Sequence, residues 1–405
     1  MAPQQTNPFR IHGVVSEQFF TDRAAELDRI LKTFAEPASK LLVYGPRRMG
    51  KTSALVRAIA RREAEGGIAF LADMSTASTL VDVANRLLEA AGRALGKKWR
   101  DSVSDFVERL GLTITLTPDA VTGIIVPSLD VKLRTAPLDE QRASLARTLD
   151  SIDALAKARQ APIGIVLDEL QEIQRFGGEA AEWHLRGIIQ HHQNVSYVLA
   201  GSQAHIIDRM LDKRRAFYGL ADQLQFGPID EAHLSSWIDD RMTNGGVRAR
   251  GVGAAIVSAA GPRTRDIVQV ARQCFDNCRG PGAATAPDVA EAFDDVVAEQ
   301  EAVFHSIWNA FTGPQQNVLR AVAANRDGLT TGATIQRFGL PSSGTASNSA
   351  RALIDDGHLV KSPSAVGYSF ENPFFRRWVE AETMGDLGAP VPPASPRTTV
   401  SPSPA

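Results

Sequence analysis

The stretch YGPRRMGKTSAL, residues 44–55, constrains the fold of this chain more than any other feature. It fits the pattern G-x-x-x-x-G-K-[ST], in which a glycine-rich turn joins a strand to a helix and its backbone N–H groups surround phosphate oxygens. The apolar run KLLVY precedes it, and KTSALVRAIARREAEGG follows it with the spacing of a helix that ends at its two glycines. The sequence therefore predicts a phosphate-binding loop after a buried parallel strand.

The residues of this loop have distinct expected roles. Lys51 should place a positive charge near the β- and γ-phosphates, and Thr52 should offer its hydroxyl to Mg²⁺. The whole loop and the start of the helix should hold a nucleoside triphosphate; the residues concerned are Gly45, Pro46, Arg47, Arg48, Met49, Gly50, Lys51, Thr52 and Ser53. No G-protein-like base motif such as N-K-x-D stands out.

A second motif follows further along the chain, where the apolar run GIVL ends at Asp168 and Glu169. Acids at the carboxyl end of a parallel strand lie at the edge where open α/β sheets bind ligands. We expect Asp168 to hold Mg²⁺ together with Thr52, and Glu169 to orient and activate the attacking water. Glu169 thus favours hydrolysis over simple binding. The next strand, YVLAG, leads to Ser202 and Gln203, which could sense the γ-phosphate and hold the water.

Strands and helices alternate from about residue 16 to residue 227, which predicts a doubly wound parallel sheet. Two runs with period-two alternation, LTITLT and SLDVKLR, interrupt this pattern. We expect them to form a β-hairpin inserted at about residues 110–135. Pro127 should confine the second strand to an edge or shift its start. The hairpin either docks a partner or decorates the scaffold, and the sequence leaves both open.

Composition limits the compartment and the partners. A net charge of −2 argues neither for nor against nucleic acid, and no run approaches the ~18 apolar residues of a membrane span. The N-terminus lacks the apolar core of a signal peptide. Cys274 and Cys278 lie one helical turn apart, where a disulfide is geometrically poor, so reduced thiols are expected. We therefore expect a cytoplasmic protein with no membrane partner.

His184, His191 and His192 fit a surface helix better than a metal site.

The C-terminal part has the pattern of a winged helix-turn-helix. QQNVLRAVAA, TTGATIQRFGL and PSSGTASNSARALIDDGHL predict three helices, and LVKSPSAVGYSFEN predicts two strands around a turn. In this arrangement the third helix can enter the major groove of DNA. Residues 312–380 hold seven Lys or Arg against five Asp or Glu, a weak excess for a protein that neutralises phosphates. Candidate contacts are Ser347, Asn348, Arg351 and Lys361; docking within the chain or to a partner remains equally open.

These segments together resemble a known family. NPFRIHGVVSEQFFTDRAAELDRI, YGPRRMGKTS, IVLDELQEI, LAGSQ and FYGLADQLQFGPI occur in the order seen in archaeal-type AAA+ ATPases, relatives of origin-recognition initiators and of STAND ATPases. The likeness runs from about Asn7 to Val379. It implies ATP as the nucleotide. It also implies an N-terminal tail at residues 1–15, followed by an α/β AAA+ core at residues 16–227 that contains the hairpin. A helical lid at 228–300 and a winged helix-turn-helix at 301–380 would follow. The proline- and serine-rich tail, 381–405, should be disordered.

The resemblance also implies roles for single residues. Phe20 and Arg23, in FFTDR, would line the adenine side of the nucleotide. Arg265, in GPRTRDIVQVA, best matches the lid arginine that reaches the γ-phosphate, with Arg263 as the substitute.

The chain departs from the family pattern at one point. Relatives often carry a basic residue after the FY motif, a candidate trans-acting finger, but Gly219 and Leu220 follow Tyr218 here. Arg214 and Arg215, just upstream, could compensate. Without such a charge, turnover would be slow, because an arginine finger can contribute about 10³–10⁵ in rate.

The sequence as a whole predicts an ATP-binding and ATP-hydrolysing switch, in which the lid and the winged helix respond to the γ-phosphate. Two alternatives remain open. One is a nucleotide-regulated protein that binds double-stranded DNA. The other is a signalling or assembly scaffold that uses ATP with little turnover and acts through a protein partner or self-association.

Overall fold

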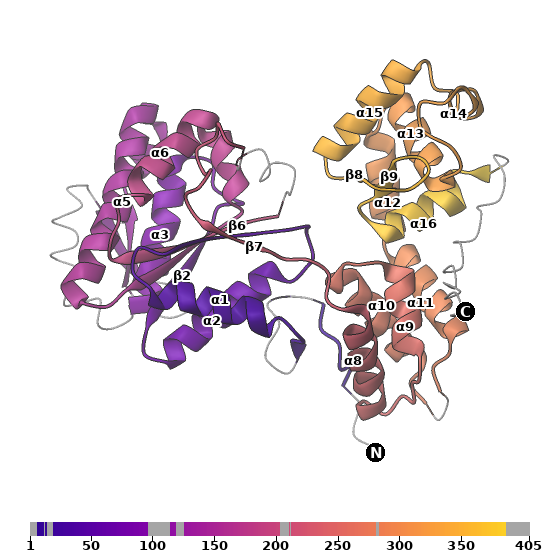
Figure 1. The fold of residues 1–405 in the computed structure, drawn as a ribbon, viewed down its shortest axis with the longest axis horizontal. Helices are drawn as coiled ribbons and strands as arrows, with labels where there is room; N and C mark the ends of the chain where they lie inside the picture. Colours follow the sequence, from indigo (N-terminus) through magenta and orange to yellow (C-terminus); the bar gives the residue numbers. More distant parts are fainter. Residues whose placement is uncertain are drawn as a thin grey trace, which may run out of the picture. The chain divides into compact units, whose positions relative to one another are not determined.

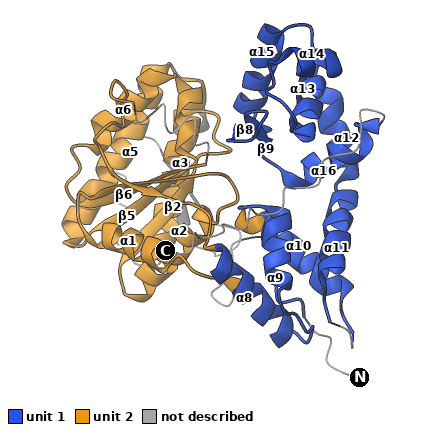
Figure 2. Cartoon of the chain, turned by 45° about the vertical axis from the view of Figure 1, so that its right-hand side comes forward, with its two compact units in different colours: residues 1–9, 231–262, 266–405 blue, residues 10–230, 263–265 orange. Residues whose placement is uncertain are grey.

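The structure, a computed structural model, describes residues 6–11, 13, 19–95, 114–118, 125–202, 210, 212–280 and 283–385, with the backbone alone for 114–118, 125–127 and 131. The predicted tail beyond residue 385 and the predicted site residue Gln203 lie outside these ranges. Two compact units make up the chain (Figure 2). The α/β unit holds residues 10–230 and 263–265, and the helical unit holds the described parts of 1–9, 231–262 and 266–405.

A parallel sheet forms the centre of the α/β unit (Figure 1). Its strands are β1 (Lys40–Tyr44), β2 (Ile68–Asp73), β5 (Ile163–Asp168), β6 (Val195–Gly201) and β7 (Asp222–Gln225). They lie in the order β2-β5-β6-β1-β7, so β1 has β6 on one side and β7 on the other. The strand order reverses next to β1, and open α/β sheets bind ligands at such a point. The predicted α/β class is confirmed.

Helices cover both faces of this sheet (Figure 1). α1 (Ala24–Ala35) and α2 (Lys51–Ala64) pack on one face, and α3 (Leu80–Leu95), α5 (Leu138–Arg159) and α6 (Glu179–Ile189) pack on the other. Successive strand residues point to opposite faces. In β6, for example, Val198 joins the core under α1 and α2, while Tyr197 and Leu199 join the other core. Burial on both faces explains why the central strands are apolar throughout.

Strand β7 was not expected from the hydrophobic pattern. Its sequence, DQLQ, is mostly exposed, and among the described strands it pairs with β1 alone, at the edge of the sheet. The N–H of Phe226 continues the pairing with a 2.7 Å hydrogen bond to the carbonyl of Tyr44. Such a short polar strand carries no period-two signal, so its position is set by tertiary pairing.

The inserted hairpin is present as β3 (Ile114–Pro118) and β4 (Ile125–Leu129), an antiparallel pair. Pro127 lies within β4, opposite Leu116. A proline is tolerated there because each strand of a two-stranded sheet has one unpaired side.

The predicted second strand, SLDVKLR (residues 128–134), is wrong over most of its length, because β4 begins earlier, at Ile125, and includes only the first two of these residues. β4 ends at Leu129, and residues Val131–Thr135 form a short 3-10 helix, η3. The carboxylate of Asp130 accepts a 2.9 Å hydrogen bond from the N–H of Lys132. This local bond turns the chain away from an extended path, which is the usual effect of aspartate at a turn.

Among the described residues, five helices precede the C-terminal part of the helical unit. They are α8 (Glu231–Asn244), α9 (Val252–Ala260), α10 (Thr264–Asn277), α11 (Ala286–Glu299) and α12 (Glu301–Ala310). The first two residues of α10, Thr264 and Arg265, belong to the α/β unit. None of the helices that the structure describes is long and apolar enough to cross a membrane.

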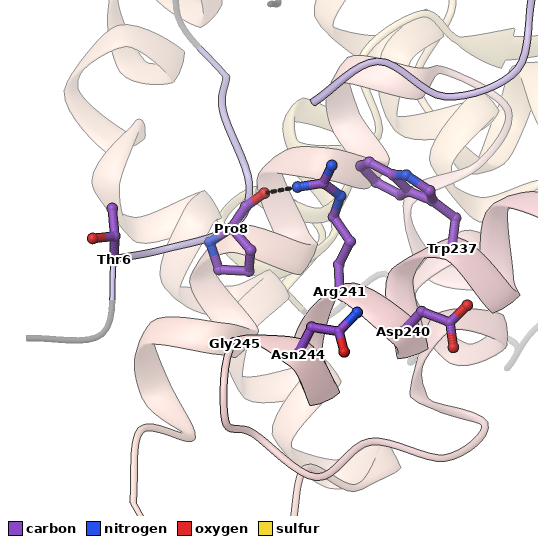
Figure 3. Close-up of a pocket in the computed structure, with 7 residues that line it drawn as sticks. All are labelled: Thr6, Pro8, Trp237, Asp240, Arg241, Asn244 and Gly245. Atoms are coloured by element: carbon purple, nitrogen blue, oxygen red, sulfur yellow. Dashed lines mark hydrogen bonds between the residues drawn. The ribbon is translucent and has the colours of Figure 1, made fainter. Parts of the chain in front are cut away.

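The segment Asn7–Phe9 packs onto α8 and α10. Phe9 is 1% exposed and makes edge contacts with Trp237 and Phe275. Figure 3 shows the guanidinium of Arg241, beside Trp237, donating to the carbonyl of Pro8 at 3.1 Å. This part of the predicted N-terminal tail is therefore an ordered element of the helical unit.

The C-terminal part has the predicted order of three helices and a wing (Figure 1). The elements are α13 (Gly313–Ala324), α14 (Gly332–Arg337), α15 (Ser343–Asp355), β8 (Leu359–Lys361), β9 (Tyr368–Phe370) and a closing α16 (Pro373–Glu382). β8 and β9 form the antiparallel wing. Phe375 and Trp378 of α16 pack with Phe304 of α12 in an aromatic cluster.

Candidate nucleotide-binding site

The phosphate-binding loop joins β1 to α2, and its geometry requires glycine at two positions. Gly45 has a φ of 150°, and a Cβ atom there would lie 2.3 Å from the carbonyl oxygen of Phe226. Gly50 has a φ of 87° and caps the N-terminus of α2. The first N–H groups of a helix have no partners within it, so they are available to phosphate oxygens.

The remaining loop side chains face two environments. Met49 is buried in the core under α1 and α2, and Ser53 is half-buried. Pro46, Arg47 and Arg48 are exposed. Two arginines on the exposed side favour an anionic ligand at this end of the sheet.

Lys51 lies beneath the loop, only 6% exposed. Its Nζ donates to the carbonyl oxygens of Gly45, at 2.8 Å, and Pro46, at 2.7 Å. Burial lowers the pKa of Lys51 to about 8, against the opposing effect of Glu169 and Asp168. The ammonium is therefore charged at neutral pH, but it is poorly solvated and gains from an anionic partner.

Thr52 and Asp168 form the candidate metal site. The Thr52 hydroxyl donates a 3.0 Å hydrogen bond to Oδ2 of Asp168, which brings α2 and the end of β5 together. Burial, followed by the charge of Glu169, raises the pKa of Asp168. A bound cation would relieve the repulsion between the neighbouring carboxylates of Asp168 and Glu169. A hydroxyl and a carboxylate are hard oxygen donors of the kind Mg²⁺ prefers, so these residues fit the ion.

Glu169 directly follows this pair in a left-handed backbone conformation, with φ of 56° and ψ of 47°. Its N–H donates to Oδ1 of Asp168 at 3.0 Å. Its carboxylate oxygen Oε2 accepts from the hydroxyl of Ser202, at 2.7 Å, and from Nε2 of Gln171. Non-glycine residues in this conformation are strained, and such strain concentrates at functional sites. Gln171 was not singled out from the sequence.

Arg23 and Phe20 lie beside the loop. The guanidinium of Arg23 donates to the carbonyls of Gly227, at 2.6 Å, and Met49, at 3.4 Å, and pairs with Glu26 at 2.7 Å. Phe20 is half-buried, with the Arg57 guanidinium 4.8 Å from its ring centroid. Arg23 thus fastens the start of α1 to the phosphate-binding loop; a contact with adenine stays a prediction for both residues.

Arg265 is near the loop through its backbone. Its N–H donates to the carbonyl of Arg48 at 3.2 Å, and its side chain is exposed. Arg263, the substitute, is 7% exposed. The structure therefore favours Arg265 over Arg263 as a residue that a ligand can reach, and the contact with the γ-phosphate stays a prediction.

The side chain of Arg215 forms ion pairs within the α/β unit. Its guanidinium binds the carboxylate of Glu182 at 2.7 Å and also pairs with Glu179. Glu182 is fully buried and receives a further 2.7 Å bond from Gln174. The idea that Arg215 supplies a trans-acting charge is therefore disfavoured by an intramolecular ion pair. Arg214 is exposed, and its role as a finger stays a prediction.

The histidines have local partners. His184 contacts the carbonyl of Arg142 at 3.0 Å, and His192 bridges Tyr197 and Asp150 at 2.7 and 2.8 Å. Over the described ranges, no group of three or more His, Cys, Asp or Glu is arranged for a metal ion. Cys274 and Cys278 are free thiols. Burial raises the pKa of Cys274 to about 12, so its thiolate is scarce at neutral pH.

The helix expected to contact DNA, α15, presents a polar surface of mixed charge. Asn348, Arg351 and Asp355 are exposed on it, and Ser347 is half-buried. Lys361 is exposed on the wing.

Comparison with known families agrees with the fold. Residues 20–236 match the family described as an ATPase domain predominantly from Archaea. Because this match covers more than half of the chain, the protein belongs to that family of P-loop ATPases. Residues 302–381 match a probable winged helix domain. The resemblance to archaeal ATPases with a C-terminal winged helix is confirmed.

Solved structures extend the comparison to about nine-tenths of the chain. A Walker-type ATPase of Pyrococcus abyssi aligns over 91% of this chain and 98% of its own, with a TM-score of 0.61 and 14% identity. The ORC2 protein of Aeropyrum pernix, solved in ADPNP and ADP complexes, aligns over 89% of this chain and 93% of its own, with a TM-score of 0.54 and 15% identity. At these identities the likeness shows the fold. No curated protein matches the chain.

Proposed function

We propose that this protein binds ATP with Mg²⁺ and hydrolyses it at the carboxyl edge of β1 and β5. The observation that carries the proposal is the position of Glu169. Its carboxylate is fixed by Ser202 and Gln171, one residue beyond the Thr52–Asp168 pair. A chain that only retains nucleotide has no need of a second, positioned carboxylate beside its metal ligands.

The phosphates would be held by the loop and its lysine. Lys51 would exchange its bonds to the carbonyls of Gly45 and Pro46 for bonds to phosphate oxygens, which gives its charge a stronger partner. The N–H groups at the start of α2 would bind the same phosphates. Arg47 and Arg48 add positive charge at the exposed side of the loop.

Thr52 and Asp168 would hold Mg²⁺, which supplies charge neutralisation at the phosphates. Glu169 would orient a water molecule and accept its proton as the water oxygen bonds to the γ-phosphorus. The bond from that phosphorus to the β–γ bridging oxygen would break at the same time, with ADP as the leaving group. Phosphoryl transfer depends mainly on positioning and electrostatics. The fixed geometry of this carboxylate therefore provides what the reaction needs.

The same site can act as a switch. The chain leaves the α/β unit after Arg265, whose N–H binds the loop carbonyl of Arg48, and continues into α10 of the helical unit. A change in the loop or in the Arg265 side chain when the γ-phosphate is lost would reach α10 directly through the chain. The winged helix would respond as part of the helical unit.

Steady-state hydrolysis of ATP with Mg²⁺ tests the proposal. Wild type should turn over ATP, and Lys51→Ala and Glu169→Gln should both abolish turnover. Lys51→Ala should also lose nucleotide binding, whereas Glu169→Gln should keep it. Bound nucleotide with no turnover in wild type, with and without duplex DNA, would contradict hydrolysis.

A second candidate is regulated binding of double-stranded DNA through the winged helix. It is supported by the exposed Asn348 and Arg351 on α15 and by Lys361 on the wing. These residues offer both amide and cationic groups to a duplex. Nucleotide-dependent changes in duplex affinity would favour this candidate.

A further inference from the structure

We propose that Gln171 positions the carboxylate of Glu169, so that one defined oxygen, Oε1, faces the attacking water. Gln171 acts through Glu169 and touches neither nucleotide nor metal in this account. The inference rests on the proposed function, because a positioned proton acceptor matters only if ATP is hydrolysed.

The geometry places two donors on one carboxylate oxygen. Oε2 of Glu169 accepts from Nε2 of Gln171 and from the hydroxyl of Ser202. Among the residues that the structure describes, no partner of the other oxygen, Oε1, is seen. Two donors on Oε2 fix the carboxylate plane and leave Oε1 as the oxygen with free lone pairs.

The orientation of the Gln171 amide follows from chemistry. An ionised carboxylate can only accept hydrogen bonds, so the amide nitrogen must face Glu169 and the amide oxygen must point away. That oxygen, Oε1 of Gln171, is buried and has no hydrogen-bond partner in the described part of the chain.

This unsatisfied oxygen argues against a purely structural role. Gln171 is only 4% exposed, and burying an unpaired amide oxygen costs stability. A methionine or leucine would fill the same space without that cost. Buried polar groups that destabilise a fold are often retained for function.

The backbone makes the contact possible. Glu169 has a left-handed conformation and is the N-cap residue of the short 3-10 helix η4 (Leu170–Phe176). Gln171, two residues later, can then reach back to the carboxylate. Ser202 arrives at the same oxygen from the end of β6, a different part of the sheet.

The test is ATP hydrolysis by Gln171→Met, a substitution that keeps the side-chain length and removes the donor. We expect kcat to fall about 10- to 100-fold, the range for a lost hydrogen bond to a charged group, while KM and the melting temperature stay within error or the melting temperature rises. Gln171→Leu serves as a second variant if Gln171→Met does not fold.

The control is Gln174→Met, which removes a similar amide-to-carboxylate bond from the same helix but acts on Glu182. It should leave kcat per folded molecule unchanged. The decisive comparison uses single-turnover rates in the Ser202→Ala background, because Ser202 donates to the same oxygen of Glu169. If the two donors act together on this carboxylate, the loss caused by Gln171→Met should differ from its loss in wild type by more than about twofold.

An unchanged kcat in Gln171→Met, a rise in KM, or the same fold-loss in the Ser202→Ala background as in wild type would overturn this inference and leave the proposed function intact. Wild type that binds ATP without turnover would overturn the proposed function, and the inference with it.

Discussion

The hydroxyl of Thr52 donates a 3.0 Å hydrogen bond to Oδ2 of Asp168, although the two residues lie 116 positions apart in the chain. One stands at the start of α2 and the other at the end of β5, so two separate strand-to-helix junctions meet at one point. This contact joins the phosphate-binding loop to the acidic pair and brings together the two oxygen donors that would hold Mg²⁺.

We predict that Thr52→Val weakens the Mg²⁺-dependent part of ATP binding. The valine keeps the shape of the side chain but removes the oxygen ligand, so adding Mg²⁺ should strengthen ATP binding about tenfold less than in wild type. Calorimetric titration of ATP with and without Mg²⁺ measures this difference. Thr52→Ser keeps the hydroxyl and should behave like wild type. Equal Mg²⁺ dependence in Thr52→Val and wild type would refute the metal role of Thr52.

ATP affinity should fall above pH 8. Burial lowers the pKa of Lys51 to about 8, so the free protein loses this charge as the pH rises past that value. A triphosphate favours the charged form, and binding must then take up a proton. The affinity should approach a loss of about tenfold per pH unit, with proton uptake detectable by calorimetry in different buffers. Lys51→Arg stays charged and should show neither effect; the same decline in both proteins would rule out Lys51 as its cause.

Replacing Arg215 should affect stability rather than chemistry. Arg215→Met leaves the fully buried carboxylate of Glu182 without its guanidinium partner, and we expect the free energy of unfolding to fall by about 3 kcal/mol. Arg214→Met, at an exposed neighbour, should change it by less than about 0.5 kcal/mol. Denaturant titration checks both values. A large loss of turnover in Arg215→Met with unchanged stability would instead identify Arg215 as the missing finger.

Duplex DNA binding, if it occurs through the winged helix, should depend on Arg351 and Lys361. Each of Arg351→Ala and Lys361→Ala should weaken binding and reduce the slope of log affinity against log salt by about 1. Arg376→Ala, on α16 and already paired with Glu380, is the control. Fluorescence anisotropy over a salt series makes the measurement. No binding at low salt, or no change in these variants, would exclude this use of α15 and the wing.

The sequence predicted the elements whose burial leaves a strong pattern. The strand before Asp168 is apolar because both of its faces are covered, and the loop from Gly45 to Thr52 has a fixed spacing because phosphate oxygens fix it. β7 and η3 escaped prediction for the opposite reason. β7 is short and polar, and η3 depends on one local bond from Asp130.

The hydrogen bonds and ion pairs between side chains were the part of the site that the sequence predicted least well. Nothing in the sequence distinguishes Gln171 from any other glutamine, because its significance comes from the left-handed backbone at Glu169 and from Ser202, 33 positions away from Glu169. Likewise, Arg215 resembled a free cation until its partner Glu182 on α6 was known. Such contacts depend on tertiary geometry, which hydrophobic periodicity does not encode.

The most direct test of the central claim is a single-turnover reaction with protein in excess over radiolabelled ATP and Mg²⁺. We predict that wild type converts the bound ATP completely to ADP and phosphate, whereas Glu169→Gln binds the same amount and keeps it as ATP. Conversion at the same rate by both proteins, or intact ATP on both, would contradict the role of Glu169 as the proton acceptor for the attacking water.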